Sequence, residues 1–184
     1  KNGIEYFSGS EENILDRFYH AAKLFESENI IRLTGDNPLL DFNIINDGIN
    51  IFLDSNYDIL SNNRKKTYPL GINFEIFSNN ALKKSWEMTS KKFSEENDFI
   101  KTFIPPTAFM LQNVNFKNFD LIYEKNISNI RLTLDYYEDF QLISKIFESL
   151  YPQNKFFALD EILKLLEKNP ELLKINKKYS TKIF

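Results

Sequence analysis

The alternation of strand and helix is clearest in residues 29–61, which read NIIRLTGDNPLLDFNIINDGINIFLDSNYDILS. Apolar runs within them predict a buried strand over 29–33, a helix over 42–53 and a strand over 57–61. Just upstream, apolar residues at helical spacing predict a helix over 12–26. Strands and helices that alternate in this way are typical of a parallel α/β sheet.

Outside this stretch the pattern is less regular, but it continues to mix strands with helices. We predict strands over 4–7, 72–77, 109–115 and 127–134. We predict helices over 81–89, 95–104 and 136–150, and a last one that stops at Asn169 and Pro170. No repeat or long linker interrupts the chain. These elements indicate one domain over 1–184, with a three-layer α/β/α architecture and a mainly parallel, mixed sheet.

Composition excludes several kinds of site. The chain of 184 residues has no cysteine, which excludes disulfides, thiolate zinc sites and cysteine nucleophiles. Its single histidine, His20, excludes a histidine-cluster metal site, and we expect it on the solvent or boundary side of the first helix. A net charge of −3 does not support a nucleic-acid surface. No apolar run approaches the ~18 residues that span a bilayer, so we expect a cytoplasmic protein that binds neither nucleic acid nor membrane.

Arginine is scarce in this lysine-rich chain, which contains Arg17, Arg32, Arg64 and Arg131. An arginine side chain can bind a carboxylate or phosphate through two parallel hydrogen bonds, which a lysine cannot do. These four positions are therefore candidates for paired contacts with such groups.

Two carboxylates directly follow predicted strands. Asp36 lies in the turn after strand 29–33, and Asp135 follows strand 127–134. Ligands of open α/β sheets bind at the carboxyl ends of the strands, and Mg²⁺ prefers one or two carboxylates with phosphate oxygens and water. Asp36 and Asp135 could therefore share Mg²⁺ with a nucleoside triphosphate. Two structural interpretations stay open beside this one, because Asp135 with Glu138 fits a helix-capping pair and Asp36 fits an ordinary turn.

Short motifs are spread from residue 4 to residue 176. They are Gly9-Ser10, Leu15-Asp16-Arg17-Phe18, Ala21-Ala22, Arg32-Leu33-Thr34-Gly35-Asp36-Asn37-Pro38-Leu39-Leu40-Asp41, Tyr68-Pro69, Gly71, Glu75-Ile76-Phe77-Ser78, Arg131-Leu132-Thr133-Leu134-Asp135, Glu138-Asp139-Phe140 and 169–176. In this order and spacing they resemble the cytidylyltransferase family that includes spore coat polysaccharide biosynthesis protein F. That family is related to the acylneuraminate and 3-deoxy-manno-octulosonate cytidylyltransferases. The resemblance implies a Rossmann-like fold of the nucleotide-diphospho-sugar transferase type.

The resemblance also implies a reaction and assigns residues to it. Family members attack the α-phosphorus of CTP with a sugar or sugar acid, release pyrophosphate and form a CMP-sugar for surface polysaccharide biosynthesis. By resemblance, Asp36 and Asp135 are the catalytic carboxylates that hold Mg²⁺. The resemblance further implies nucleotide contacts from Gly35, Arg17 and Arg32, and substrate contacts from Asn73, Glu75 and Arg131. Relatives are often dimers, so a homodimer is a further expectation.

The chain also departs from the family pattern. Family members open with a glycine-rich loop that wraps the triphosphate, and nothing before Ile4 supplies it. We therefore expect an N-terminally truncated chain, the C-terminal part of the family domain, that does not turn over alone. Asn73 stands where an aspartate is usual, Leu70 where a basic residue is common, and Phe99 where the family has a histidine. These changes indicate an altered acceptor or lost activity.

Two other functions stay open. A catalytically degenerate relative would bind a nucleotide or a partner without chemistry, which Asn73 and Phe99 favour and the intact Asp36 and Asp135 oppose. A glycosyltransferase of similar architecture usually carries Asp-x-Asp after a strand, whereas this chain has an Asp-Asn-Pro sequence there. The sequence therefore ranks the CTP-dependent transferase first and the glycosyltransferase last.

Overall fold

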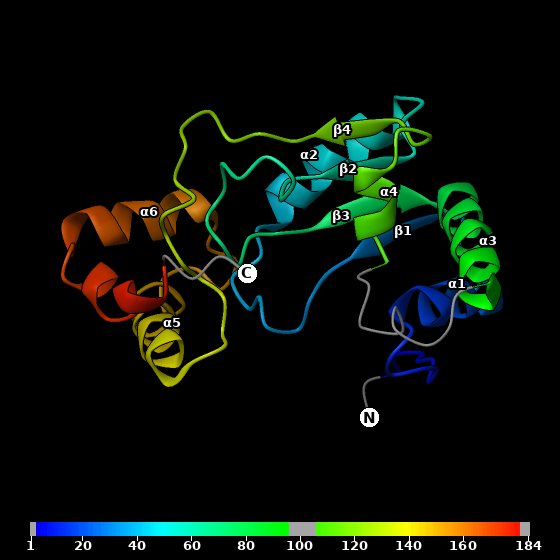
Figure 1. Cartoon of the computed structure of the whole chain (residues 1–184). Coiled ribbons are helices and arrows are strands. Elements are labelled where there is room, and N and C mark those ends of the chain that lie inside the picture. The colour runs from blue at the N-terminus through cyan, green and yellow to red at the C-terminus, as the bar shows by residue number, and fades with distance from the viewer. Residues whose placement is uncertain (1–2, 96–105, 181–184) are drawn as a thin grey trace. The chain divides into compact units, whose positions relative to one another are not determined.

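A computed structural model describes residues 3–95 and 106–180 of the chain (Figure 1). The helices are α1 Ile14–Leu24, α2 Phe42–Leu53, α3 Asn79–Glu95, α4 Ala108–Gln112, α5 Tyr137–Leu150 and α6 Leu159–Lys168. The strands are β1 Asn29–Arg32, β2 Ile59–Ser61, β3 Glu75–Ser78 and β4 Asn118–Asp120. Two short 3₁₀ turns, η1 Leu172–Lys174 and η2 Lys177–Tyr179, follow α6. The predicted α/β fold is confirmed.

The four strands form one sheet in the order β1-β3-β2-β4. The end of β3 meets the start of β2, because the amide of Ser78 bonds the carbonyl oxygen of Asp58 at 3.2 Å. It also meets the start of β1, because the amide of Asn79 bonds the carbonyl oxygen of Glu28 at 2.8 Å. Strand β3 is therefore antiparallel to both of its neighbours.

Strand β4 runs in the same direction as β2. The amide of Leu121, just after β4, bonds the carbonyl oxygen of Ser61 at the end of β2. Strands β1, β2 and β4 thus share one direction and β3 opposes them, so the sheet is mixed as predicted. Among the described strands, however, β2 and β4 form the parallel pair and β3 pairs antiparallel with both β1 and β2, so the pairing is less parallel than predicted. The carboxyl end of β1 leads directly into the turn that contains Asp36.

The predicted strand–helix–strand stretch is confirmed, since β1, α2 and β2 occupy it in order. The predicted helices over 12–26 and 136–150 correspond to α1 and α5, and the last helix ends before Asn169. The helix predicted over 81–89 is part of the longer α3. The strand predicted over 72–77 begins only at Glu75, and residues 96–104 of another predicted helix lie outside the described residues.

Three predicted strands are wrong. Residues 4–7 form no strand, and Ile4 and Tyr6 are 79% and 84% exposed, without the burial that an apolar strand needs. Residues 109–115 begin as helix α4, which turns Met110 into the core. Within 127–134 the chain makes an isolated parallel bridge between Arg131 and Leu70 rather than a ladder. Strand β4 was not predicted, because three residues are too few for a periodic signal.

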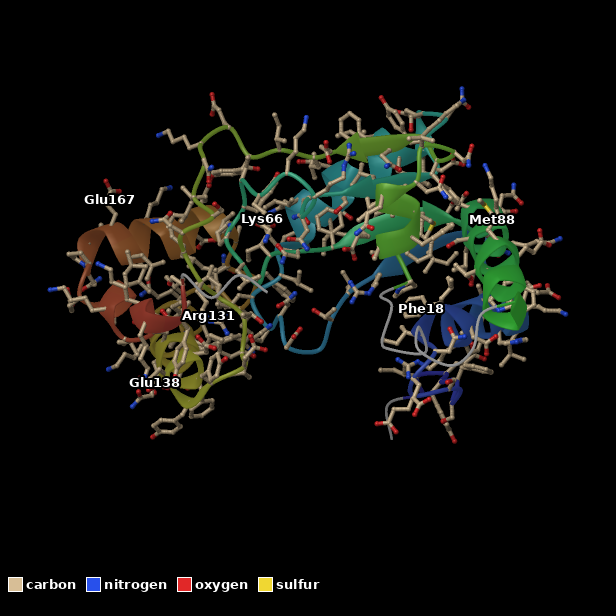
Figure 2. The ribbon with its side chains drawn as sticks, in the orientation of Figure 1. Phe18, Lys66, Met88, Arg131, Glu138 and Glu167 are labelled. Atoms are coloured by element: carbon tan, nitrogen blue, oxygen red, sulfur yellow. The ribbon has the colours of Figure 1, made fainter. Side chains whose placement is uncertain are left out.

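The chain forms two compact units, each with its own apolar core. Unit 1 is built from the described parts of 1–31, 55–60 and 75–119. Its helices α1 and α3 pack side by side (Figure 1), and Phe18 and Met88 contact its core (Figure 2). The stacked rings of Tyr19 and Trp86, 4.2 Å apart, join the same two helices. His20 is exposed on α1, as predicted.

Unit 2 is built from the described parts of 32–54, 61–74 and 120–184. Helices α5 and α6 pack against each other and supply most of its core. The buried carboxylate of Asp41 links two helices: Oδ1 accepts the amide of Asn43 at the start of α2, and Oδ2 accepts the amide of Leu159 at the start of α6. An aspartate at this position satisfies amides that a helix start leaves unpaired.

A glycine lets two segments of unit 2 approach closely beside this core. Leu70 accepts the amide of Leu132, and the next residue, Gly71, has φ +108°. A Cβ atom on Gly71 would collide with backbone atoms of Leu132 and Thr133, including the Leu132 carbonyl oxygen at 2.6 Å. Glycine is therefore required here both for its backbone conformation and for space.

Candidate active site

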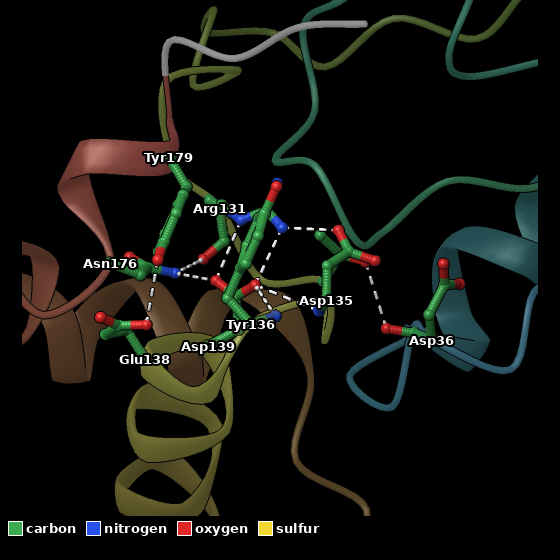
Figure 3. A network of polar contacts seen from close by, with 9 residues as sticks. Asp36, Arg131, Asp135, Tyr136, Glu138, Asp139, Asn176 and Tyr179 are labelled. Carbon is green, nitrogen blue, oxygen red and sulfur yellow. Dashed lines mark hydrogen bonds and ion pairs between the residues drawn. The ribbon is translucent and has the colours of Figure 1, made fainter.

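The structure brings the segments of the two predicted carboxylates together in unit 2. The backbone oxygen of Asp36 accepts the amide of Leu134 at 2.8 Å and the hydroxyl of Thr133 at 3.2 Å. The side chain of Asp36 is exposed, and Figure 3 shows its carboxylate pointing away from this backbone contact. Asp135 directly follows Leu134, so the two carboxylates come from adjoining segments that hydrogen bonds hold in register.

Asp135 is held on one side and open on the other. Its Oδ2 accepts a hydrogen bond of 2.5 Å from Nη2 of Arg131, and its side chain is 45% exposed. Within the described ranges 3–95 and 106–180, no hydrogen bond or ion pair engages its second oxygen, Oδ1. The capping interpretation of Asp135 with Glu138 is wrong: the N-cap residue of α5 is Tyr136, and Asp139 accepts its amide.

Asp139 forms a buried, two-bonded ion pair with Arg131. Nε and Nη2 of Arg131 donate to the two carboxylate oxygens at 2.9 and 2.8 Å. The side chain of Asp139 is fully buried and that of Arg131 is 3% exposed. This is the planar arrangement that arginine makes and lysine cannot. The guanidinium of Arg131, which the sequence predicted as a substrate contact, faces the carboxylates of Asp139 and Asp135 (Figure 3).

The ion pair stabilises the charged form of both Asp139 and Arg131. Burial would raise the pKa of Asp139, but hydrogen bonds from Arg131, Asn176 and two backbone amides outweigh burial and hold the pKa below its usual value. Burial would likewise lower the pKa of Arg131, but its bonds to Asp139 and Asp135 raise it instead. Both groups are therefore charged at neutral pH.

The C-terminal segment closes over this ion pair. The buried amide of Asn176 donates to Oδ1 of Asp139 at 2.8 Å and to the backbone oxygen of Arg131 at 3.0 Å. The ring of Tyr179 stacks on that of Tyr136 at 3.8 Å, with the planes only 4° apart. Figure 3 shows these side chains converging on the start of α5.

Two further predicted residues lie in unit 2. Gly35 is exposed, and a Cβ atom there would meet nothing within 4 Å. Asn73 is half-buried at the centre of a clamp, because the side-chain amide of Asn62 donates to the Ile72 carbonyl and accepts the Phe74 amide. The clamp fixes the backbone on both sides of Asn73 and so presents that side chain in a defined position.

The remaining predicted residues occupy separate places. Arg17, in unit 1, donates from Nη1 to the backbone oxygen of Ser10 at 2.9 Å. Glu75, also in unit 1, is buried at the start of β3. Arg32 is half-buried at the end of β1 and belongs to unit 2. Phe99 lies outside the described residues, and Leu70 forms the bridge to Arg131.

Asp139, Asn176 and Tyr179 were not predicted as site residues. Asp139 lies three positions after the N-cap of α5, a position where an acid usually serves the helix alone. Asn176 is 37 residues from its partner Asp139, and a single sequence carries no signal that joins them. The scarcity of arginine was the one sequence signal that pointed to this network, because it marked the arginines as candidates for paired contacts. Arg131 makes such a two-bonded pair with Asp139, and Arg64 makes one with Asp120.

The two carboxylates of the candidate site suit a hard cation such as Mg²⁺, whose remaining coordination positions a bound ligand and water would fill. The described residues contain no cluster of three or more histidine, cysteine or acidic side chains. Asp36 and Asp135 instead offer two accessible carboxylates, and Mg²⁺ commonly takes one or two carboxylates with phosphate oxygens and water.

A family model described as cytidylyltransferase matches residues 3–179, nearly the whole chain. The chain belongs to the cytidylyltransferase family. This cytidylyltransferase is similar to a solved cytidylyltransferase from Leptospira borgpetersenii, with a TM-score of 0.79 and 27% identity over 94% of this chain and 69% of that one. Membership of the family supports nucleotidyltransferase activity on a nucleotide substrate.

Two further relatives match along most of the chain. An uncharacterized protein of Methanocaldococcus jannaschii is 33% identical over 181 residues, which are 95% of this chain and 68% of the relative. The spore coat polysaccharide biosynthesis protein SpsF of Bacillus subtilis is 28% identical over 175 residues, which are 93% of this chain and 68% of SpsF. This cytidylyltransferase thus spans about two thirds of the length of these relatives. Across its described residues, none of its helices has the length and apolar character needed to cross a membrane.

Proposed function

We propose that this cytidylyltransferase transfers a cytidylyl group from CTP to a sugar or sugar acid for surface polysaccharide biosynthesis. The hydroxyl oxygen of the acceptor bonds to the α-phosphorus and its proton passes to solvent. The bond between the α-phosphorus and the oxygen that bridges to the β-phosphorus breaks, and pyrophosphate leaves with that oxygen. The observation that carries the proposal is the pair of accessible carboxylates, Asp36 and Asp135, on adjoining segments. The similarity to SpsF, whose name includes polysaccharide biosynthesis, supports the role of the product.

Asp36 and Asp135 are the residues that would hold Mg²⁺ in this scheme. Both are oxygen donors open to solvent, and Asp135 keeps one oxygen without a protein partner among the described residues. When bound there, Mg²⁺ would neutralise charge on the phosphates of CTP. The chain's own contribution is to hold the two carboxylates in register through the backbone bonds of Asp36.

Two of the other assigned residues would bind the two substrates. We propose Arg32 as a contact to phosphate or to the carboxylate of a sugar acid, and Asn73 as an acceptor contact, because both lie in unit 2 with Asp36 and Asp135. The clamp that Asn62 makes around Asn73 supports this role, because a fixed backbone positions a side chain for recognition.

Replacing Asp36 or Asp135 with asparagine is expected to weaken Mg²⁺-dependent CTP binding by about tenfold or more, because each change removes a charged oxygen donor. Isothermal titration of each variant with CTP, with Mg²⁺ and with EDTA, measures the effect. Asp54→Asn is the matched control, since Asp54 is an exposed aspartate in the same unit. Unchanged Mg²⁺-dependent affinity in both variants would contradict the metal assignment.

Gly35→Ala is expected to leave the free energy of unfolding unchanged or raised by about 0.4–1 kcal/mol, because the methyl group meets open space and restricts the unfolded chain. The same variant is expected to bind CTP more weakly if the nucleotide lies against the Gly35 backbone. Urea denaturation and titration with CTP separate the two effects. Full CTP affinity in the variant would remove Gly35 from the proposed nucleotide site.

Release of pyrophosphate from CTP with Mg²⁺ and a panel of sugars and sugar acids tests the reaction itself. The expected result is release that depends on one class of acceptor and is lost in Asp135→Asn. CTP binding without release for any acceptor would instead favour a catalytically degenerate relative. Preference for a UDP-sugar with Mn²⁺ over CTP would point to a glycosyltransferase.

A further inference from the structure

Arg131 is paired with two carboxylates, so its positive charge does not fully neutralise Asp135, which can still bind a cation. Arg131 donates two hydrogen bonds to the fully buried Asp139 and one to the half-exposed Asp135. A lone arginine beside Asp135 would compete with a cation for that carboxylate. Because Asp139 already neutralises Arg131, the three side chains together keep one net negative charge, and its solvent-facing part is on Asp135.

Asp139 also fixes the position of Asp135 through the backbone. Its Oδ2 accepts the amide of Asp135 at 3.1 Å and the amide of Tyr136 at 3.0 Å. Asp135 is therefore held at two atoms: its amide by Asp139, and its carboxylate by Arg131. Among the residues that the structure describes, these contacts leave Oδ1 without a partner, so it can face a ligand.

Asn176 supports Asp139 from a distant part of the sequence. Its amide binds both Asp139 and the backbone of Arg131, and the side chain is 2% exposed. Two neighbours in the same segment hold the start of α5 as well, since Tyr179 stacks on Tyr136 and Lys178 pairs with Glu138 at 2.6 Å. We call residues 176–179 the C-terminal clasp.

We propose that Asn176 is a positioning residue, which holds Asp139 and Arg131 so that Asp135 keeps one oxygen oriented for the metal–nucleotide complex. The effect on metal binding rests on the proposed function, but the positioning of Asp135 by Asn176 is a property of the folded chain. It also reassigns Arg131, which holds Asp135 instead of contacting substrate.

The test compares Asn176→Ala with Asn169→Ala. Asn169 is a matched control, because its side-chain amide also bonds a backbone oxygen in unit 2, that of Leu165 at the end of α6. Hydrogen exchange of the Asp135 and Tyr136 amides, followed by NMR, is expected to speed up about tenfold in Asn176→Ala only. The Mg²⁺ concentration that half-saturates CTP binding is expected to rise about tenfold, also in Asn176→Ala only.

The two measurements separate positioning from function. Equal exchange of both amides in Asn176→Ala and the wild type would overturn the positioning role. Faster exchange in Asn176→Ala with an unchanged Mg²⁺ requirement would overturn the link to metal binding. If CTP binding by the wild type does not depend on Mg²⁺, the proposed function is refuted, and the exchange result alone then decides the positioning role. If Asn176→Ala does not fold, Tyr179→Leu loosens the clasp without touching Asp139 and is expected to speed the same two amides; unchanged exchange there would count against the clasp.

Discussion

Asp139→Asn is expected to lower the free energy of unfolding by about 3–5 kcal/mol, because it breaks a buried ion pair by removing one partner. The substitution keeps the size of the side chain, but within the described part of the chain it leaves the guanidinium of Arg131, 3% exposed, with the half-exposed Asp135 as its one charged partner. Urea denaturation at neutral pH measures the loss. Asp54→Asn serves as the control and is expected to change stability by less than about 0.5 kcal/mol.

Acid should shrink the difference between Asp139→Asn and the wild type. Burial would raise the pKa of Asp139, but the hydrogen bonds from Arg131, Asn176 and two amides hold it below the usual value. A carboxylate with a depressed folded pKa contributes stability that is complete above its unfolded pKa of about 4 and disappears as the pH falls through the folded value. The deficit of the variant should therefore be constant above about pH 5 and decrease below about pH 4. A deficit independent of pH down to acid unfolding would contradict the assigned ion pair.

Gly71→Ala is expected to destabilise the chain by about 3 kcal/mol or more, since strain at positive φ adds to a backbone collision. Gly71 has φ +108°, and the added methyl group would lie 2.6 Å from the carbonyl oxygen of Leu132. Both residues border the bridge between Leu70 and Arg131, so a backbone shift that relieves the collision is expected to disturb that bridge. Thermal and urea unfolding of the variant measure the loss.

Gly35→Ala provides the control for this second substitution. Both glycines lie in unit 2, but a Cβ atom at Gly35 meets nothing within 4 Å. If Gly71→Ala lowers the free energy of unfolding and Gly35→Ala does not, the loss is caused by the local backbone at Gly71. Equal effects at both positions would contradict the close approach described for Gly71.

The sequence predicted those elements whose apolar residues repeat over several turns. The helices α2 and α5 follow the 3.6-residue period through 12 and 14 residues, and their bounds agree closely with prediction. The segment 109–115 failed because a short apolar run fits a strand and a helix equally well, and the core selected the helix that buries Met110. The segment 127–134 begins with a turn, in which the amide of Ile130 bonds the carbonyl oxygen of Ile127, and its pairing is limited to one bridge, which depends on the distant residue Leu70.

The candidate site also has a part that the sequence indicated and a part that it did not. The approach of the Asp36 and Asp135 segments was expected only if two strand ends lay side by side, but of these two residues only Asp36 follows a strand, β1, and the segment before Asp135 makes a single bridge, to Leu70. The network behind Asp135 was not predictable, since it depends on Asn176 meeting Asp139 after the chain has folded back. Local spacing suggested a cap made by Asp135, but the fully buried Asp139 accepts the amide of the N-cap residue Tyr136 and also pairs with Arg131.

The carboxylate of Asp41 connects positions that are synthesised at different times. Its two helix-start partners lie on α2 and α6, and Leu159 is 118 residues further along the chain. At about 5–20 residues per second, a ribosome needs roughly 6–24 s to add those residues. Throughout that interval α2 has its own cap but no α6 to pack beside. Unit 2 therefore completes its core only after α6 has been synthesised, and until then apolar side chains such as Leu39 lack their partners from α6.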